Sequence, residues 1–324
     1  MCSRSIDLTR TRLFFATDVH GSETCFLKFL NSAKPYNANP LILGGDLTGK
    51  TLIPIVKGKD GRHRANFLGT ERVLNLEAEV TVLERRISSI GSYSYVVDAD
   101  GLAELDADRA KLDALFSHLM VERLRRWVGL AEERLRGTGI KLYMTGGNDD
   151  PFFIDEVLRS SSTIIDPESM VVDIDGVHEM LGCAFTNPTP WKTPKELTEE
   201  ALYEKLTALV HKVSNPSHCI FNIHAPPHAS GLDTCQQVGE GFKPVFVHGQ
   251  PSMTSCGSTA VRRVVEEFQP LLGLHGHIHE SRGAASIGRT LCLNPGSEYT
   301  EGILRGVIVN IEVEKVRSHL LTSG

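Results

Sequence analysis

The chain has 324 residues, of which 41% are hydrophobic and 23% charged, and its formal net charge is −6. These values are typical of globular proteins and exclude a disordered or collagen-like chain. The net charge argues against a broad basic nucleic-acid surface, although it allows a local basic patch. No stretch is long and apolar enough to span a membrane, and residues 1–12 lack the apolar run of a signal peptide. We therefore expect a cytoplasmic protein.

The cysteines support the same compartment. Seven are scattered along the chain, an odd number without any C-x-x-C pair. This pattern favours reduced thiols over a disulfide framework. We interpret each cysteine as a small buried hydrophobe.

Polar residues follow the first two predicted strands at the point where each strand ends. Residues 12–17 form a short apolar run of the buried-strand type, and Asp18 and His20 come directly after it. Residues 40–43 form a second such run, which is followed by two glycines and Asp46. Paired glycines let the backbone turn sharply and approach whatever the aspartate binds.

The sequence changes character between residues 51 and 138. Residues 52–68 predict a hairpin around a Gly-Lys-Asp-Gly turn, and residues 76–90 have the apolar spacing of a helix. Residues 105–135 predict a long, charge-rich helical region. We interpret residues 51–138 as a mostly helical insertion into a core of residues 1–50 and 139–324. A cap, a homodimer interface and plain structural elaboration all remain open as its role.

Three more predicted strands of the core also end at polar residues. They precede Asn148, His224, and the run that contains His275, His277 and His279. In an open α/β sheet, ligands gather at the carboxyl ends of the strands. Carboxylate, amide and imidazole donors of this kind suit two divalent ions of Mn, Fe, Zn or Ni, and the lack of cysteine among them argues against a structural thiolate zinc site.

The ordered motifs D-x-H, G-G-D, G-G-N-D, H-A-P-P and G-H-x-H resemble the calcineurin-like metallophosphoesterases, in particular their Icc-related phosphoesterase branch. The resemblance covers roughly residues 12–49 and 140–312 but not the insertion. It implies an α/β fold, a four-layer α/β/β/α sandwich, and a pair of metal ions. By the family's pattern one ion is held by Asp18, His20, Asp46 and His279, and the other by Asp46, Asn148, His224 and His277.

The resemblance also implies a reaction. A hydroxide that bridges the two ions would attack the phosphorus of a phosphate ester in line. Asp46, Asn148 and Asp149 are the catalytic residues implied, and Mn is the first choice of metal. A small phosphate ester, with nucleotides among the candidates, is the expected substrate.

One position departs from the family's pattern. The family usually has histidine after the asparagine, where it acts near the leaving group, and this chain has Asp149. Asp149 could act as a general acid only if burial or the neighbouring Asp150 raises its pKa well above the usual value of about 3.9. Alternatively, both carboxylates orient neighbouring ligands or cap a helix. Loss of the histidine favours a phosphodiester or a substrate with an activated leaving group, while a phosphomonoesterase, a nuclease and a catalytically silent metal-binding scaffold stay open.

Five other residues are weaker candidates. His228 and His248 flank a long loop and could replace the missing acid, or be exposed loop histidines. His275 is expected to support the ligands or to pack within the sheet. Asn187 and Trp191 could line the substrate cleft, or belong to a proline-rich turn.

Overall fold

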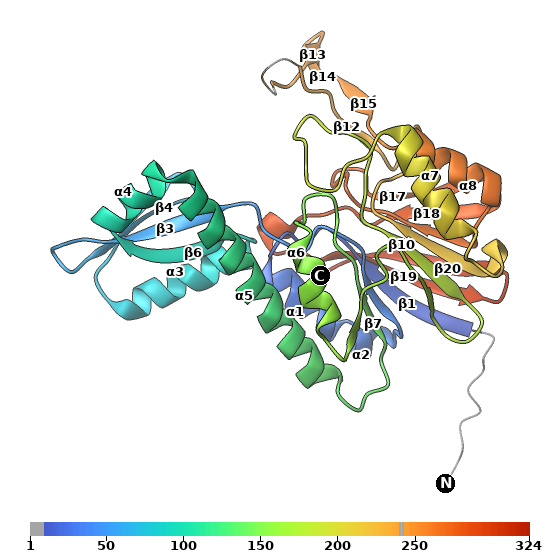
Figure 1. The fold of residues 1–324 in the computed structure, drawn as a ribbon, viewed down its shortest axis with the longest axis horizontal. Helices are drawn as coiled ribbons and strands as arrows, with labels where there is room; N and C mark the ends of the chain where they lie inside the picture. The colour runs from blue at the N-terminus through green and yellow to red at the C-terminus, as the bar shows by residue number, and fades with distance from the viewer. Residues whose placement is uncertain (1–9, 240, 242) are drawn as a thin grey trace.

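The computed structural model describes residues 10–239, 241 and 243–324. The expectation that residues 1–12 are not a signal peptide concerns mainly residues 1–9, which lie outside the described residues. Two six-stranded sheets form most of the core (Figure 1). The chain is thus a mixed α/β protein with several sheets, which agrees with the predicted fold class. No helix in the described part of the chain is long and apolar enough to cross a membrane.

The first sheet has the strand order β20-β19-β1-β2-β7-β8. Its strands are β1 (Arg10–Ala16), β2 (Leu41–Leu43), β7 (Leu142–Met144), β8 (Ile164–Ile165), β19 (Arg305–Glu312) and β20 (Lys315–Ser323). Strands β1, β2, β7 and β8 pair in parallel, and β19 and β20 add antiparallel strands at one edge. The loops that follow β1, β2 and β7 therefore leave the same end of the sheet.

The second sheet has the order β17-β18-β16-β11-β10-β9. Its strands are β9 (Val171–Asp173), β10 (Glu179–Cys183), β11 (Cys219–Ile223), β16 (Leu272–Leu274), β17 (Gly283–Ile287) and β18 (Thr290–Asn294). Strands β10, β11, β16 and β18 are parallel, with an antiparallel strand at each edge. The loops after β11 and β16 thus also lie side by side.

The hydrophobic residues of the core fall into three clusters that follow the alternation of the strands. Leu13 and Phe15 of β1 pack with Leu272 of β16 in a cluster between the two sheets. Phe14 points to the other face of the first sheet and packs with residues of α1 (Glu23–Asn31), α5 (Arg109–Leu135) and α6 (Phe153–Arg159). A third cluster joins the second sheet to α7 (Glu199–Val210) and α8 (Thr259–Phe268). Successive strand residues face opposite sides, so one strand serves two clusters.

Two helices of the core begin at capping serines. Ser22 caps α1, its hydroxyl accepting from the N–H of Cys25, and Ser258 caps α8 in the same way. Several short elements are also described in the core. They include α2 (Ala33–Tyr36), η1 (Pro216–His218), η3 (Tyr299–Glu301), and the small strands β12 (Thr234–Gln236), β13 (Phe246–Val247), β14 (Gln250–Pro251) and β15 (Met253–Ser255).

The segment between β2 and β7 forms a separate sheet and three helices. The sheet has the order β5-β4-β3-β6, and its elements are β3 (Leu52–Lys57), β4 (His63–Phe67), β5 (Thr70–Leu74), α3 (Glu77–Ser89), β6 (Tyr93–Asp98), α4 (Ala99–Ala107) and α5 (Arg109–Leu135). Strand β5 is missing from the sequence-based prediction, so the expected hairpin is part of a larger sheet. In Figure 1 this segment projects to one side, and α5 runs back along the core.

Aromatic stacking fastens α5 to the core. The ring of Trp127 lies 4.1 Å from that of Phe26 on α1, with 4° between the planes, and its indole N–H donates to Glu23. Arg126 forms an ion pair with the same glutamate. Closer to the strand ends, Arg123 donates to the carbonyl of Gly21 and stacks on Tyr93.

The prediction that all cysteines are separate thiols is wrong for one pair. Cys235 and Cys256 form a disulfide, because the antiparallel pairing of β12 with β15 brings two residues 21 apart in the sequence together. The described free cysteines, Cys25, Cys183, Cys219 and Cys292, are buried as predicted. Cys2 lies outside the described residues.

A charged pair at the turn between β9 and β10 ties the two sheets together. The ring Nδ1 of buried His178 lies 2.7 Å from Asp175, which also accepts from Thr11 of β1. Burial alone would lower the pKa of His178, but the carboxylate of Asp175 outweighs it and raises that pKa. Burial would likewise raise the pKa of Asp175, but its hydrogen bonds to His178 and Thr11 hold it well below the usual range.

We expect Asp175→Asn to destabilise the protein mainly in weakly acid solution. A raised histidine pKa stabilises the fold below about pH 6.5, and a lowered aspartate pKa stabilises it above about pH 4, so the pair contributes most between these values. Charged hydrogen bonds contribute about 1.5–3 kcal/mol and this one is partly exposed, so a loss of about 1–2 kcal/mol is expected. Urea unfolding of both proteins at pH 5.5 and pH 9 measures this loss of unfolding free energy. An equal loss at both pH values would contradict the assignment of a charged His178–Asp175 pair.

Candidate metal centre

Five loops converge at the carboxyl ends of the parallel strands, three from the first sheet and two from the second. They carry the residues that the sequence selects, namely Asp18 and His20 after β1, Asp46 after β2, Asn148 after β7, His224 after β11, and His277 and His279 after β16. All but the half-buried His277 and His279 are buried. The two sheets thus bring together side chains as far apart in the sequence as Asp18 and His279.

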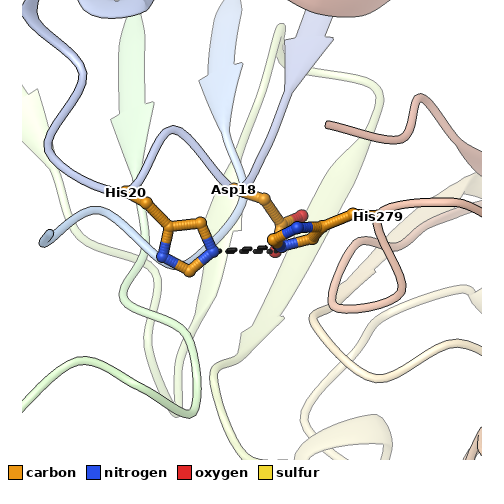
Figure 2. A group of neighbouring side chains, drawn as sticks. All are labelled: Asp18, His20 and His279. Carbon is orange, nitrogen blue, oxygen red and sulfur yellow. Dashed lines mark hydrogen bonds and ion pairs between the residues drawn. The ribbon is translucent and has the colours of Figure 1, made fainter. Parts of the chain in front are cut away.

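The first group of potential ligands is Asp18, His20 and His279 (Figure 2). The Nε2 atoms of the two imidazoles lie 3.0 Å apart, and that of His279 lies 3.3 Å from the Asp18 carboxylate. Burial lowers the pKa of His20 to about 3, so its ring is neutral and can offer a lone pair. Two ring nitrogens directed at each other beside a carboxylate fit a shared cation.

Asp46 faces two different imidazoles with its two oxygens. Its Oδ2 lies 3.5 Å from Nε2 of His20, and its Oδ1 lies 3.4 Å from Nε2 of His224. The His224 nitrogen also lies 3.8 Å from Asp18, which makes Asp18, Asp46 and His224 a second group of potential ligands. The position of Asp46 between the groups is the one that a bridging carboxylate needs.

Asn148 presents a buried amide oxygen to the site. Its Nδ2 donates to the hydroxyl of Thr193, and Thr193 in turn donates to Glu196. The Oδ1 of Asn148 and the Nε2 of His224 are both buried without a hydrogen-bond partner. Buried polar atoms without partners are costly, and two of them beside the carboxylates indicate room for a ligand. The donor set therefore fits metal ions.

His277 lies beside the second group. Its ring is 5.5 Å from that of His224, and its backbone N–H donates to the carboxylate of Asp18. Burial, followed by the charge on His224, lowers its pKa to about 4, so this imidazole is neutral too. The assignment of His277 and Asn148 to a second metal ion stays a prediction.

The centre favours positive charge. Burial alone would raise the pKa values of Asp18 and Asp46, but neighbouring histidines, His224 first, hold both well below the usual range. Burial would lower the pKa of His224, yet the two carboxylates outweigh it and raise that pKa to about 9. Two ionised carboxylates at full burial need a cationic partner, which metal ions can also supply.

Four candidate ligands have a left-handed backbone. The φ angles are 53° at Asp18, 40° at His20, 49° at Asp46 and 67° at His277. Such conformations are uncommon outside glycine, and they concentrate at functional sites. Two glycines near these ligands are required because there is no room for a side chain. A Cβ at Gly147 would overlap with the carboxylate of Asp46, and one at Gly276 would overlap with that of Asp18.

Asp150 holds the loops in place, which confirms one of the alternatives given for it. Its buried carboxylate accepts from the backbone N–H groups of Leu47, Thr48 and Gly147, each at 2.8 Å. These bonds tie the loop after β2 to the loop after β7, and so fix Asp46 against Asn148. Asp150 therefore acts as a positioning residue.

Asp149 lies at the mouth of the centre. It belongs to a third group of potential ligands with His20 and Asp46, and its carboxylate pairs with Lys50. Burial, followed by the charge of Asp46, raises its pKa to about 6. The shift has the direction that a general acid needs.

Sequence reasoning missed two side chains at the centre. One is Lys50, which follows the loop of Asp46. The other is Tyr299, whose ring lies 4.7 Å from that of His20 and 6.0 Å from that of His279. The available signal was the N-P-G-S turn just before Tyr299, because it follows β18, a strand parallel to β16, and ligands gather at the carboxyl ends of parallel strands.

The weaker candidates make their described contacts elsewhere. His228 lies 3.8 Å from Asp233, and His248 is exposed in the turn between β13 and β14. Nδ1 of buried His275 lies 2.9 Å from the carbonyl of Ile223, which agrees with packing within the sheet. The amide of Asn187 donates to the carbonyl of Cys256. Trp191 is 64% exposed.

Comparisons with known proteins bear on the fold. No family model matches the chain. The uncharacterized protein MJ1162 of Methanocaldococcus jannaschii is 34% identical over 157 residues, which cover 48% of this chain and 62% of the relative, so the match spans less than two thirds of that protein. TT1561 of Thermus thermophilus superposes with a TM-score of 0.51 at 13% identity, over 98% of this chain and 99% of that one.

A further match has a name that states an activity. YfcE of E. coli, described as a phosphoesterase, matches with a TM-score of 0.29 at 12% identity, over 96% of this chain and 98% of its own. That score carries no inference. The chain thus shares its mixed α/β fold with TT1561, and it holds a buried set of aspartates and histidines that could bind metal ions.

Proposed function

We propose that the protein is a hydrolase of phosphate esters that depends on two metal ions, with a phosphodiester as its preferred substrate. The observation that carries this proposal is the position of Asp46, whose two oxygens face imidazoles of two different groups. The three hydrophobic clusters also support the finer fold prediction of a four-layer α/β/β/α sandwich.

The residues present fit the family's two ligand sets. The first ion would be held by Asp18, His20, Asp46 and His279, and the second by Asp46, Asn148, His224 and His277. Two divalent ions, when bound, supply charge that lowers the pKa of a water molecule and neutralises the phosphate in in-line displacement. The oxygen and nitrogen donors fit Mn, Fe, Zn or Ni, with Mn as our first choice.

The chain's own groups at the mouth would select the substrate. Lys50 is cationic, and it offers an ammonium to a phosphate oxygen next to the ligands. Asp149 stands where the family has a histidine. A carboxylate at this place disfavours the second negative charge of a monoester, which supports the choice of a diester. Asp149 as the proton donor to the leaving group remains a hypothesis.

Elemental analysis and a hydrolysis assay test the proposal together. We expect about two transition-metal ions per chain after loading with Mn²⁺, since the donor set serves two ions. We also expect bis(p-nitrophenyl) phosphate to be hydrolysed faster than p-nitrophenyl phosphate. Bound metal without turnover would favour a silent scaffold. Faster turnover of the monoester would contradict the preference for diesters.

A further inference from the structure

A cavity of about 490 Å³ opens beside the candidate metal centre. It lies between the first strand of the inserted sheet, the turn between β4 and β5, and residues 299–300 of the core. Apolar side chains are prominent in its wall, among them Leu52, Ile53, Leu68 and Ile90. Lys50 is the one charged residue of the lining, which lies wholly within the described part of the chain.

Two residues join this cavity to the metal centre. Lys50 lines the cavity, and its ammonium pairs with Asp149 beside Asp46. Tyr299 lines it as well, and its ring packs against His20. A molecule with its phosphate at the candidate ligands therefore has the cavity next to it.

The walls of the cavity are held to the loops that carry the ligands. The hydroxyl of Tyr93 accepts from the backbone N–H of Gly49, three residues after Asp46. Arg123 stacks on the same tyrosine and donates to the carbonyl of Gly21, the residue after His20. The inserted segment is thereby anchored next to both ligands, so the cavity is formed before a substrate arrives.

Leu68 is an unusual residue at the rim. It is 75% exposed and its φ is 52°, in a turn where the next residue, Gly69, also has a positive φ. Turns of this kind prefer asparagine or glycine at both positions, and a branched apolar side chain is disfavoured there. Exposure of the side chain to water adds nothing to stability. A contact with a ligand would explain the leucine.

We propose that this cavity binds the organic group of the phosphate ester, and that this group is uncharged, largely apolar and about the size of a nucleoside. The volume lies within the range of small-molecule sites, about 300–1,000 Å³. Lys50, which lies next to the candidate ligands, is the only charged residue in the described lining. The rest of the lining is uncharged, and it therefore suits a neutral group that is covalently attached to a phosphate. The inference rests on the proposed function and adds the class of substrate.

Two substrates with the same leaving group test the inference. Thymidine 5′-(p-nitrophenyl) phosphate carries a nucleoside, whereas methyl p-nitrophenyl phosphate carries only a methyl group. We expect the Mn²⁺-loaded protein to prefer the thymidine ester in kcat/KM. Leu68→Asn, which suits the left-handed backbone, should reduce that preference about fivefold, mostly through KM, because part of an apolar contact is lost. Asn66→Trp, which fills the cavity from β4, should reduce it further.

Leu76→Asn is the matched control. Leu76 is 63% exposed, precedes α3 in the same inserted segment, and does not line the cavity. Turnover of the methyl ester should be unchanged in all three variants. If both esters are hydrolysed and the preference is the same in every variant, the inference is overturned while the proposed function stands.

A binding measurement keeps the test independent of turnover. Titration calorimetry of the Mn²⁺-loaded protein with thymidine 5′-monophosphate should show weaker binding to the Leu68 and Asn66 variants than to wild type and the control. Equal affinities would overturn the inference even if neither ester is hydrolysed. If the wild-type protein hydrolyses neither ester, but the Leu68 and Asn66 variants bind the nucleotide more weakly than wild type, the proposed function is wrong and the cavity remains a nucleotide site.

Discussion

Asp46→Asn should abolish phosphodiester hydrolysis and metal occupancy together. Each oxygen of Asp46 faces a different imidazole, so the substitution removes the one carboxylate common to both proposed ions. We expect kcat/KM to fall by at least about a thousandfold, since metal ions supply both the nucleophile and the charge stabilisation. Asparagine has the same shape and tolerates the left-handed backbone of this position, so the fold should survive.

Asp166→Asn is the control for this experiment. Asp166 is also buried, and it pairs with Arg159 rather than with the candidate ligands. Its replacement should leave metal content and activity at wild-type levels. Elemental analysis and initial rates with bis(p-nitrophenyl) phosphate measure both quantities. An Asp46→Asn protein that keeps its metal and its activity would show that the bridging role is wrong.

Trp127→Ala should cost about 3–5 kcal/mol in free energy of unfolding, the usual range for a buried tryptophan. Its ring is 1% exposed and stacks on Phe26, so truncation leaves a large cavity between α5 and α1. It also removes the indole donor to Glu23. Urea unfolding followed by circular dichroism measures the loss without depending on tryptophan fluorescence.

Trp127→Phe separates packing from hydrogen bonding at the same place. Phenylalanine keeps an aromatic ring on Phe26 but lacks the indole N–H, so its loss should be clearly smaller than that of alanine. Similar losses for both variants would mean that the ring stack contributes little, contrary to its geometry.

The sequence anticipates the parts of the structure that local chemistry determines. The buried runs before Asp18, Asp46 and His224 are strands, because short β-branched and aromatic runs bounded by glycine or polar residues have few alternatives. Serines 22 and 258 cap helices because their hydroxyls satisfy free backbone donors. Within each sheet, convergence of the strand ends follows from parallel pairing, so the members of the candidate site could be named, whereas the meeting of the two sets depends on how the two sheets pack.

The parts that escape prediction depend on contacts between distant segments. Strand β5 is almost wholly exposed and lacks an apolar face, so its sequence carries little pattern. The Cys235–Cys256 pair depends on β12 and β15 lying side by side, which 21 residues of separation do not reveal. Lys50 and Tyr299 come from opposite ends of the core, and only the folded chain places both at the ligands.

The inserted segment leaves the core after β2 and returns at β7, and these two strands are hydrogen-bonded neighbours. Its two ends are joined by the carboxylate of Asp150, independently of what lies between them. We therefore expect that the length and content of the segment can vary while Asp46 and Asn148 keep their spacing. A graft from a related protein would have to reproduce the packing of α5 on α1 and the anchors at Gly21 and Gly49, and it could then transfer a new substrate preference to an unchanged candidate metal centre.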